Sequence, residues 1–323
     1  PNTAWRSPGE RRRVSPGFAM SGAAHSPAMA RAAGAGARAP ARGGGRAGTG
    51  PALWVLLGPP LAFIGVLFLL PLAQVIWGSF FTPEFSLAQY ARIVETPVYL
   101  QVLARTARVA IVTTALCIVL GYPAALYLAS VKPTTRQWLL LCVVVPFFLS
   151  MLIRNFIWMA LLQRAGLVNR ALMDLGWITE PLPLMYNEFG MLVTMTNMLL
   201  PYTIFPILSS LLAIPPELRN ASASLGAGRL RTFLRITLPL SLPGVAAGGL
   251  LVFIVALGFF ITPALVGGPK QMMISNLIDF SVREVLNWPF AFALANVLLW
   301  GTLVFYFVYV RMVEGRLPRT GIV

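Results

Sequence analysis

The stretch NASASLGAGRLRTFLRITLPLSLPG, residues 220–244, combines three arginines with a glycine-rich break and two prolines. The whole chain of 323 residues is 57% hydrophobic and only 11% charged, whereas a soluble protein carries about a quarter charged residues. The composition therefore predicts a membrane protein. The basic stretch is then expected to lie outside the hydrocarbon, as a connection between two membrane spans.

Long runs without Asp, Glu, Lys or Arg lie on both sides of this stretch: 47–83, 109–131, 190–216, 236–269 and 285–310. A sixth apolar run, 137–162, is interrupted only by Arg154. Each run is long enough for a helix of about 20 residues, the length that crosses the hydrocarbon core of a bilayer. The sequence therefore predicts an all-α, polytopic membrane protein with six transmembrane helices.

The basic residues are distributed unequally between the two sides that six spans define. The N-terminal tail, the 131–137 loop, the 214–241 loop and the C-terminal tail together hold 17 of the 25 basic residues but only three of the ten acids. Because basic loops stay in the cytoplasm, we expect both termini and the 214–241 loop to be cytoplasmic.

The first 50 residues differ from the rest in composition, being rich in Ala, Gly, Pro and Arg. Such a segment cannot bury enough apolar surface to fold, so residues 1–50 are expected to form a disordered cytoplasmic tail. Nothing else supports a nucleic-acid partner, and we expect none. Met20 and Met29 are candidate translation starts, because the sequence opens on Pro1. Residues 51–100 should hold the first transmembrane helix and a periplasmic segment, 101–312 a core of five helices, and 313–323 a cytoplasmic tail.

Residues 214–241 are predicted to form a helix–turn–helix hairpin. Pro216 suits the first turn of a helix, Gly226 a left-handed helix cap, and Pro239 the end of a second helix. Apolar and small residues recur at helical spacing, namely Leu218, Ala221, Ser222 and Leu225, then Leu230, Phe233, Leu234 and Thr237. Helices this short are unstable alone, so the hairpin should either lie flat at the lipid interface or dock on a cytoplasmic partner.

One sequence pattern in the hairpin resembles a known motif. It comprises Asn220, Ala221, Ser222, Leu225, Gly226 and Ala227, followed by Phe233, Ile236, Leu238 and Pro239. This pattern resembles the EAA motif of bacterial ABC importer permeases of the MetI-like (type I) family. In that family the loop forms a coupling helix that sits in a cleft of the ATP-binding subunit. The chain departs from the motif at Asn220, where the family has Glu, and at Ser222, where it has Ala. A hydrogen bond would replace an ionic contact at Asn220.

The resemblance extends over residues 53–311. The stretches 146–158, 166–190, 257–270 and 276–299 resemble the spermidine/putrescine branch of the family, although permeases for thiamine, ferric iron and phosphonates share much of the pattern. It implies the type I ABC importer permease fold, with the core at 101–312, in a bacterial inner membrane. It also implies three kinds of partner besides membrane lipid: a dimer of ATP-binding subunits, a second permease subunit and a periplasmic solute-binding protein.

The chain lacks the residues for catalysis or nucleotide binding. It contains no G-x-x-x-x-G-K-[ST] pattern for ATP phosphates, and His25 is its only histidine. We therefore expect a non-catalytic subunit that binds no cofactor, with ATP and Mg²⁺ held by the partner ATPase. The alternative, an ATP-independent secondary transporter, predicts inverted repeats and intramembrane charges, and neither is clear in the sequence.

Candidate residues for the solute pathway, or for docking of the binding protein, lie in and outside the spans. Arg154, near Trp158, is expected either to snorkel toward the outer surface or to line a cavity or subunit interface. Carboxylates and aromatic rings suit a polyamine, and the outer loops supply Asp174, Glu180, Asp279, Glu284 and Trp288. Ordinary solvated loop charges are the alternative for these residues. Residues 259–269, rich in Gly and Pro, point either to an outer gate or to a simple span end.

Overall fold

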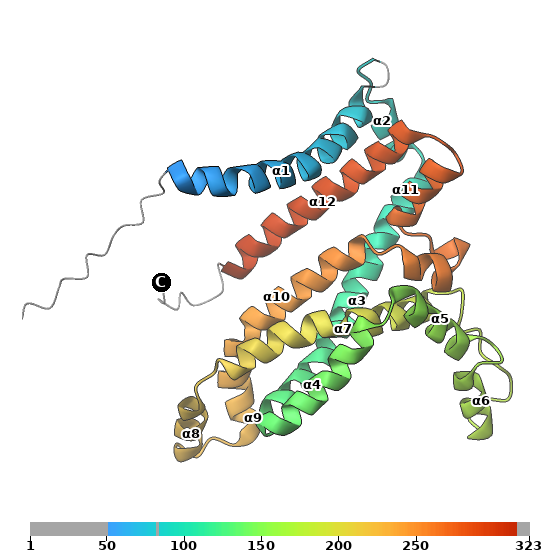
Figure 1. Cartoon of the computed structure of the whole chain (residues 1–323). Helices are drawn as coiled ribbons and strands as arrows, with labels where there is room; N and C mark the ends of the chain where they lie inside the picture. Colours follow the sequence, from blue (N-terminus) through green and yellow to red (C-terminus); the bar gives the residue numbers. More distant parts are fainter. Residues whose placement is uncertain (1–50, 82–83, 315–323) are drawn as a thin grey trace, which may run out of the picture. The chain divides into compact units, whose positions relative to one another are not determined.

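The computed structural model describes residues 51–81 and 84–314 (Figure 1). These residues are almost entirely helical and include no β-strand, which confirms the all-α class. The chain divides into two units, residues 1–61 and 62–323. The second unit holds the rest of the first helix and all later helices. The predictions made for residues 1–50 and 315–323 lie outside the described residues.

Within residues 51–81 and 84–314, five helical segments are long and apolar enough to cross a membrane. They are α1 (Pro51–Phe80), α3 (Pro97–Ser130), α7 (Glu188–Leu212), α10 (Leu238–Leu257) and α12 (Trp288–Glu314). Shorter elements connect them: α2 (Ala88–Glu95), α6 (Leu167–Asp174), α8 (Pro216–Ser224), α9 (Arg229–Thr232), α11 (Ile274–Arg283), the π-helical turns η1 (Phe233–Thr237) and η2 (Pro263–Gly267), and the 3-10 turn η3 (Pro269–Gln271).

The sixth predicted span, residues 137–162, is two helices instead of one. It consists of α4 (Pro133–Phe148) and α5 (Met151–Leu162), and the chain bends by 97° at the break between them. Leu149 and Ser150 have extended backbone there. Pro146, in the last turn of α4, lacks the N–H that would continue the helical hydrogen bonds. With the bent pair counted as one crossing, the described part of the chain offers six by length and composition.

Helices α3, α7 and α10 pack together as the centre of the second unit. At one end, Leu128 near the end of α3 packs with Leu211 near the end of α7 and with Val245 near the start of α10. At the other end, Val109, Met191 and Leu257 share a second cluster. Helices α3 and α7 therefore run in the same direction, and α10 runs in the opposite one.

Two glycines of α10 let its backbone approach α7 closely. A Cβ on Gly244 would lie 2.5 Å from the carbonyl oxygen of Pro206, and one on Gly248 would lie 3.1 Å from the Cα of Thr203. Because lipid tails are as apolar as the side chains, helices in a membrane associate through small residues that allow such approach. The spacing of four residues places both glycines on one face of α10.

A buried polar cluster connects α12 to the end of α1 and to α2. The side-chain amide of Asn296 donates a 2.7 Å hydrogen bond to Ser79 Oγ. Ser79 and the Tyr90 hydroxyl share a hydrogen bond of 2.9 Å. Polar side chains that cross between helices in this way add to packing in a bilayer, so this cluster fixes the second half of α1 against α12.

We expect Gly244→Ala to lower the thermal stability of the purified protein. The added methyl must displace the α7 backbone, at a cost of about 1–3 kcal/mol for overpacking. Gly301→Ala is the matched control, because a Cβ at Gly301 meets no atom within 4 Å and alanine favours a helix interior. Thermal unfolding of both variants in the same detergent measures the difference. Equal melting temperatures for the two variants would contradict the close contact at Gly244.

Candidate functional site

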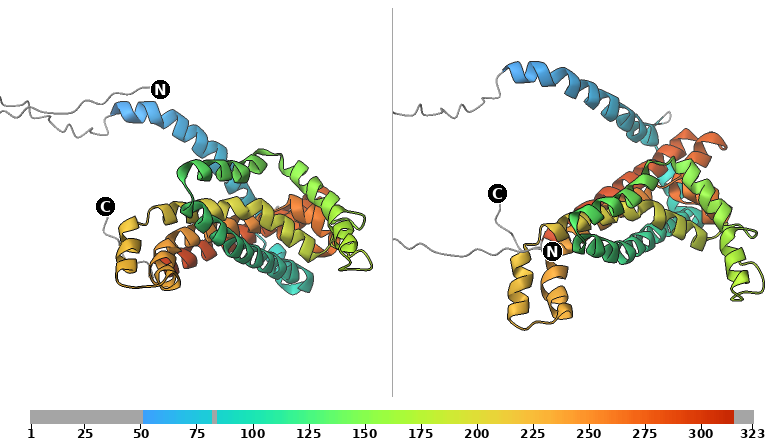
Figure 2. Two further views of the ribbon diagram at one scale, coloured as in Figure 1. Left: turned by 90° about the horizontal axis from the view of Figure 1, so that it is seen from below. Right: turned by 60° about the horizontal axis from the view of Figure 1, so that its bottom comes forward.

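Residues 216–237 form a hairpin that projects from the packed helices (Figure 2). Its first arm, α8, begins at Pro216 as predicted, and its second arm is α9 followed by η1. Three residues separate α8 from α7, whereas η1 continues directly into α10. The hairpin is therefore joined at its base to α7 and α10, whose backbones approach closely at Gly244 and Gly248.

The turn between the arms is a glycine-dependent helix cap. Gly226 has φ +73°, the left-handed conformation that the sequence predicts. Its N–H donates to the carbonyl of Ala223 at 2.9 Å, and the Ala227 N–H donates to the carbonyl of Ser222 at 3.1 Å. These two bonds are the Schellman arrangement, which satisfies the last carbonyls of a helix.

Contacts missed by the sequence analysis hold the two arms in place. The hydroxyls of Ser222 on α8 and Thr232 on α9 share a hydrogen bond of 2.7 Å. The ring of Phe233 meets the ring of Tyr122 on α3 edge-to-face, with 5.9 Å between centroids. Ser222 stands where the family motif has alanine, and its buried hydroxyl here joins one arm to the other.

The tip of the hairpin presents apolar side chains to the outside. Leu225 is 87% exposed and Leu230 is 70% exposed. Asn220, Ala221 and Gly226 are exposed as well. The described residues therefore leave the motif surface uncovered, although a short hairpin with exposed leucines gains stability only by burying them.

The prediction that Pro239 ends the second helix is wrong. Helical structure runs without a break from Arg229 to Leu257, and Pro239 lies in the first turn of α10. The Leu238 N–H bonds to the carbonyl of Phe233, five residues back. A proline lacks an N–H and crowds the carbonyl four residues before it, and the wider π turn η1 accommodates that gap. The second arm and α10 are consequently one continuous helical segment.

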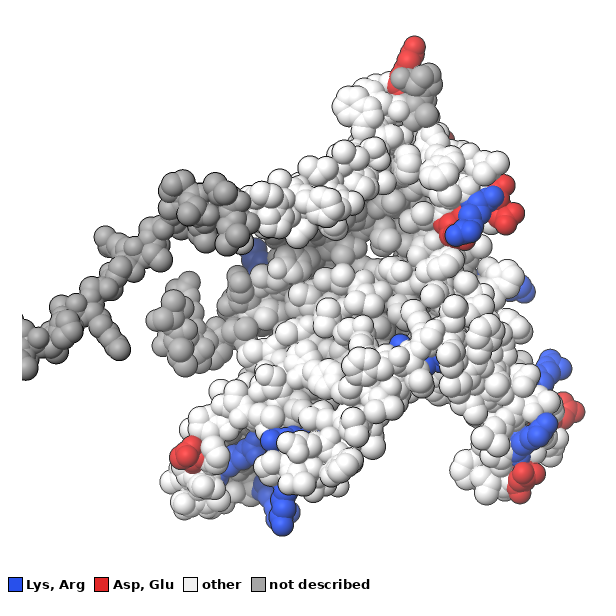
Figure 3. All heavy atoms as spheres, viewed as in Figure 1, with Lys and Arg blue, Asp and Glu red and all other residues white. Residues whose placement is uncertain are grey.

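Charge is distributed unequally along the second unit. Figure 3 shows basic atoms gathered over the end that carries α8 and α9, whereas acidic atoms at the other end lie among basic ones. The hairpin contains Arg219, Arg229, Arg231 and Arg235 but only one acid, Glu217. At the opposite end, Arg108 pairs with Glu188.

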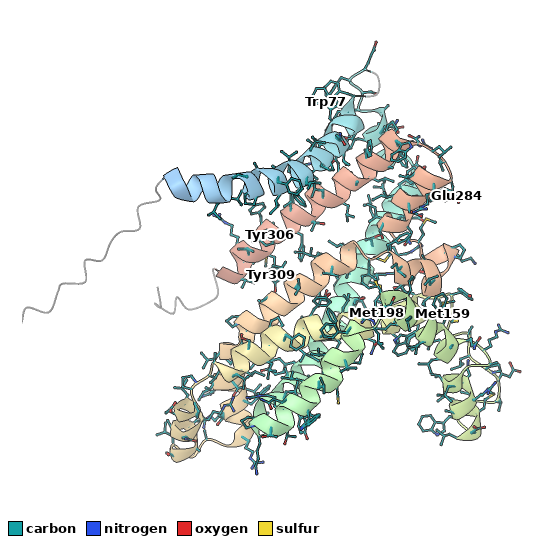
Figure 4. All side chains as sticks on the ribbon, viewed as in Figure 1. Trp77, Met159, Met198, Glu284, Tyr306 and Tyr309 are labelled. Carbon is teal, nitrogen blue, oxygen red and sulfur yellow. The ribbon has the colours of Figure 1, made fainter. Side chains whose placement is uncertain are left out.

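At the end away from the hairpin, α10 is followed by a broken segment that contains the predicted 259–269 stretch. Helix α10 ends at Leu257, η2 and η3 follow, and Gly268 between them has φ +75°. Thr262, just before η2, is fully buried and donates to Asn155 Oδ1 on α5 at 2.8 Å. Asn155 in turn donates to the carbonyl of Met151 at 2.8 Å. The bond between Thr262 and Asn155 lies beside Met198 of α7 (Figure 4) and connects the broken segment to the bent span.

Arg154 and Trp158 lie on α5 beside this bond and contact different partners. The Arg154 guanidinium lies over the Phe147 ring, 5.8 Å from its centroid, and its Nε is buried without an acceptor among the described residues. Trp158 Nε1 donates to Asn197 Oδ1 on α7 at 3.1 Å. The first contact connects α5 to α4 across the bend, and the second connects α5 to α7.

The structure brings two of the outer carboxylates together. Asp279 and Glu284 line one cavity of about 300 Å³ beside the broken segment, with the rings of Phe260 and Phe280; Glu284 is labelled in Figure 4. Asp279 Oδ1 also accepts a 2.6 Å hydrogen bond from Arg283. Asp174 and Glu180 are not part of this cavity; they lie in α6 and after it. Trp288 begins α12 and packs against Phe292.

Comparison with protein families and curated proteins gives consistent matches. Residues 117–317 match the family model described as binding-protein-dependent transport system inner membrane component. The spermidine/putrescine transport system permease protein PotB of Salmonella typhimurium is 36% identical over 232 residues, which cover 69% of this chain and 80% of that protein. The inner membrane ABC transporter permease protein YdcU of Escherichia coli is 30% identical over 265 residues, covering 76% of this chain and 84% of that protein.

Solved structures show the same fold. A chain of a bacterial ABC transporter that imports the acidic polysaccharide alginate superposes with a TM-score of 0.70 at 18% identity. The superposition covers 81% of this chain and 94% of the other. The alginate transporter in complex with its alginate pentasaccharide-bound periplasmic protein gives a TM-score of 0.69 at 18% identity, over 84% of this chain and 96% of the other.

We expect Gly226→Ala to loosen the hairpin turn, because an L-residue in the left-handed conformation costs about 1–2 kcal/mol. Hydrogen exchange of the N–H groups of residues 226 and 227 should accelerate by about 5- to 30-fold. Gly228→Ala is the matched control, since Gly228 has φ −65° and no atom within 4 Å of an added Cβ. Unchanged exchange in Gly226→Ala would show that the cap does not hold the turn.

We expect the hydrogen bond between Asn155 and Thr262 to show energetic coupling. Thr262→Val leaves Asn155 Oδ1 buried without a donor, at a cost of about 1–3 kcal/mol. Asn155→Leu removes the acceptor, and the double variant removes both, so its destabilisation should be smaller than the sum of the two single effects. Melting temperatures of the four proteins measure the coupling. Strict additivity would contradict the bond.

Proposed function

The chain belongs to the family of binding-protein-dependent transport system inner membrane components, and we propose that it is the ABC importer permease for polyamines such as spermidine and putrescine. The observation that carries the choice of solute is the 36% identity to a spermidine/putrescine permease over 69% of the chain. Thiamine, ferric iron and phosphonates are the alternative solutes, because their permeases share much of the sequence pattern.

We propose that the chain works with two ATP-binding subunits, a second permease subunit and a periplasmic binding protein. The exposed apolar tip around Leu225 supports docking of an ATP-binding subunit. ATP and Mg²⁺ are bound by those subunits, and the permease itself is not catalytic, since its sequence has no phosphate-binding glycine loop. The alginate transporter with its periplasmic protein provides a structural precedent for the last partner.

The proposed orientation places the hairpin and both termini in the cytoplasm. The ends of α3 and α7 and the start of α10 share one cluster, so the connection with Lys132 and Arg136 lies at the hairpin end. The Tyr309 hydroxyl near the end of α12 donates to the Ala246 carbonyl of α10, which places the end of α12 on that side too. The positive-inside rule assigns this basic end to the cytoplasm.

Coupling follows from the way the hairpin is joined to the spans. Closure of the ATP-binding subunits displaces the tip at Leu225. The continuous helical segment from Arg229 to Leu257, which comprises the second arm and α10, transmits this displacement. At its far end, the bond between Thr262 and Asn155 connects the broken segment to the bent span. The permease thereby alternates between inward- and outward-facing states by rigid-body motion of packed helices.

The solute pathway is proposed to open at the broken segment. The cavity at Asp279 and Glu284 offers carboxylates and the faces of Phe260 and Phe280, which suit an ammonium group through ion pairing and cation–π contact. Arg154, Trp158, Asp174, Glu180 and Trp288 are the further candidates for this pathway or for docking of the binding protein.

The proposed function is tested by uptake in a bacterial strain that lacks polyamine importers. We expect the chain, expressed with its partner subunits, to confer saturable uptake of radiolabelled spermidine or putrescine that stops when cellular ATP is depleted. Unlabelled polyamine should compete, and thiamine should not. Uptake that persists without ATP would contradict an ABC importer, and competition by thiamine alone would contradict the choice of solute.

We expect Leu225→Asp to reduce this uptake at least tenfold while the protein still inserts in the membrane, because a charge at the tip cannot be buried in a partner without a large desolvation cost. Leu225→Met is the matched control at the same position, since it keeps an apolar tip of similar size. Uptake in both strains, normalised to permease in the membrane, measures the effect. Full uptake with Leu225→Asp would contradict docking through the tip.

A further inference from the structure

The hairpin carries positive charge that nothing in the described chain neutralises. Residues 216–237 contain four arginines and only one acidic residue, Glu217. Within residues 51–81 and 84–314, ion pairs form only between Arg108 and Glu188 and between Arg283 and Asp279. The Nε of Arg219 is shielded from solvent and has no acceptor among these residues. Arg229, Arg231 and Arg235 are exposed and form no ion pair within the described residues, so they are open to a partner.

Arg229 and Arg231 lie beside the apolar tip, and Arg219 and Arg235 lie nearer the base of the hairpin. Arg219 lies on α8, Arg229 and Arg231 on α9, and Arg235 on η1, while the exposed Leu225 directly follows α8 and the exposed Leu230 lies on α9. An apolar centre with a charged rim is the usual anatomy of a protein–protein interface. At Asn220, where the motif of the family has an acid, this chain has a neutral amide, so the rim is basic throughout except for Glu217.

We propose that the groove of the ATP-binding subunit that receives this hairpin is rimmed by carboxylates, which pair with Arg229, Arg231 and Arg235. This inference rests on the proposed function and adds the chemistry of the partner surface. Complementary charge across an interface sets partner choice and accelerates association. The chain therefore selects an ATP-binding subunit with an acidic groove and rejects one with a basic groove.

The geometry favours a protein groove over lipid headgroups. The second arm continues α10 along one helix from Arg229 to Leu257, and the hairpin projects from the packed helices (Figure 2). The nine residues of α9 and η1 extend by about 13 Å at 1.5 Å per residue. A hairpin bound to a lipid surface would lie in the interface plane with its leucines inserted, whereas here the bond between Ser222 and Thr232 holds the arms side by side.

The test measures how firmly the ATP-binding subunit is retained by the complete complex in nanodiscs as salt rises from about 0.05 to 0.5 M, a range over which exposed charges become screened. We expect retention to fall with salt. The double variant Arg229→Gln and Arg231→Gln should weaken retention about tenfold at low salt and flatten the salt dependence. The matched control, Arg164→Gln with Arg170→Gln, removes two exposed arginines outside the hairpin and should leave retention unchanged. Equal retention in both double variants would overturn the proposal.

Two further comparisons separate the possible outcomes. Leu225→Asp tests docking itself: its failure to reduce retention would overturn the proposed function, whereas lost retention in Leu225→Asp with no effect of the arginine variants would overturn only the acidic groove. The second comparison is between nanodiscs of phosphatidylcholine and nanodiscs of phosphatidylglycerol. An arginine effect in both supports the acidic groove, and an effect confined to phosphatidylglycerol assigns the arginines to lipid headgroups and overturns it.

Discussion

The close contact of α10 with α7 at Gly244 and Gly248 is the constraint on which the rest of the structure depends. The hairpin leaves the bundle from the end of α7 and returns through the start of α10, so the contact that packs the two spans also fixes the hairpin base. Larger residues at these two positions would separate the spans and the arms together. A small-residue helix contact inside the bilayer thus determines the geometry of a surface outside it.

The hairpin and the broken segment occupy opposite ends of the same helix. One end is exposed and basic, and its shape comes from the Gly226 cap and the bond between Ser222 and Thr232. The other end is buried, and the bond between Thr262 and Asn155 holds it against the bent span. Because α10 is continuous with the second arm, one helical segment joins the two ends, and the proposed alternating access relies on this connection.

Much of this architecture was predictable from the sequence because the bilayer restricts what can cross it. A backbone in hydrocarbon must satisfy its own hydrogen bonds, so charge-free runs of sufficient length predict helices, and a glycine after a helical pattern predicts the cap at Gly226. The effects of Pro146 and Pro239 were not predictable in the same way. One proline accompanies a sharp bend and the other a π turn in a continuous helix, and neighbouring packing decides between these outcomes. Asn155 and Thr262 lie 107 residues apart, and no local spacing reveals their bond.

The central claim is that the tip of the hairpin is buried in an ATP-binding subunit, and cross-linking tests it most directly. A photoreactive amino acid in place of Leu225 would be irradiated in native membranes that contain the whole transporter, and the adduct identified by mass spectrometry. A covalent adduct with an ATP-binding subunit is the expected result. Adducts with lipid alone, or with a protein exposed to the periplasm, would contradict both the docking of the hairpin and its cytoplasmic location.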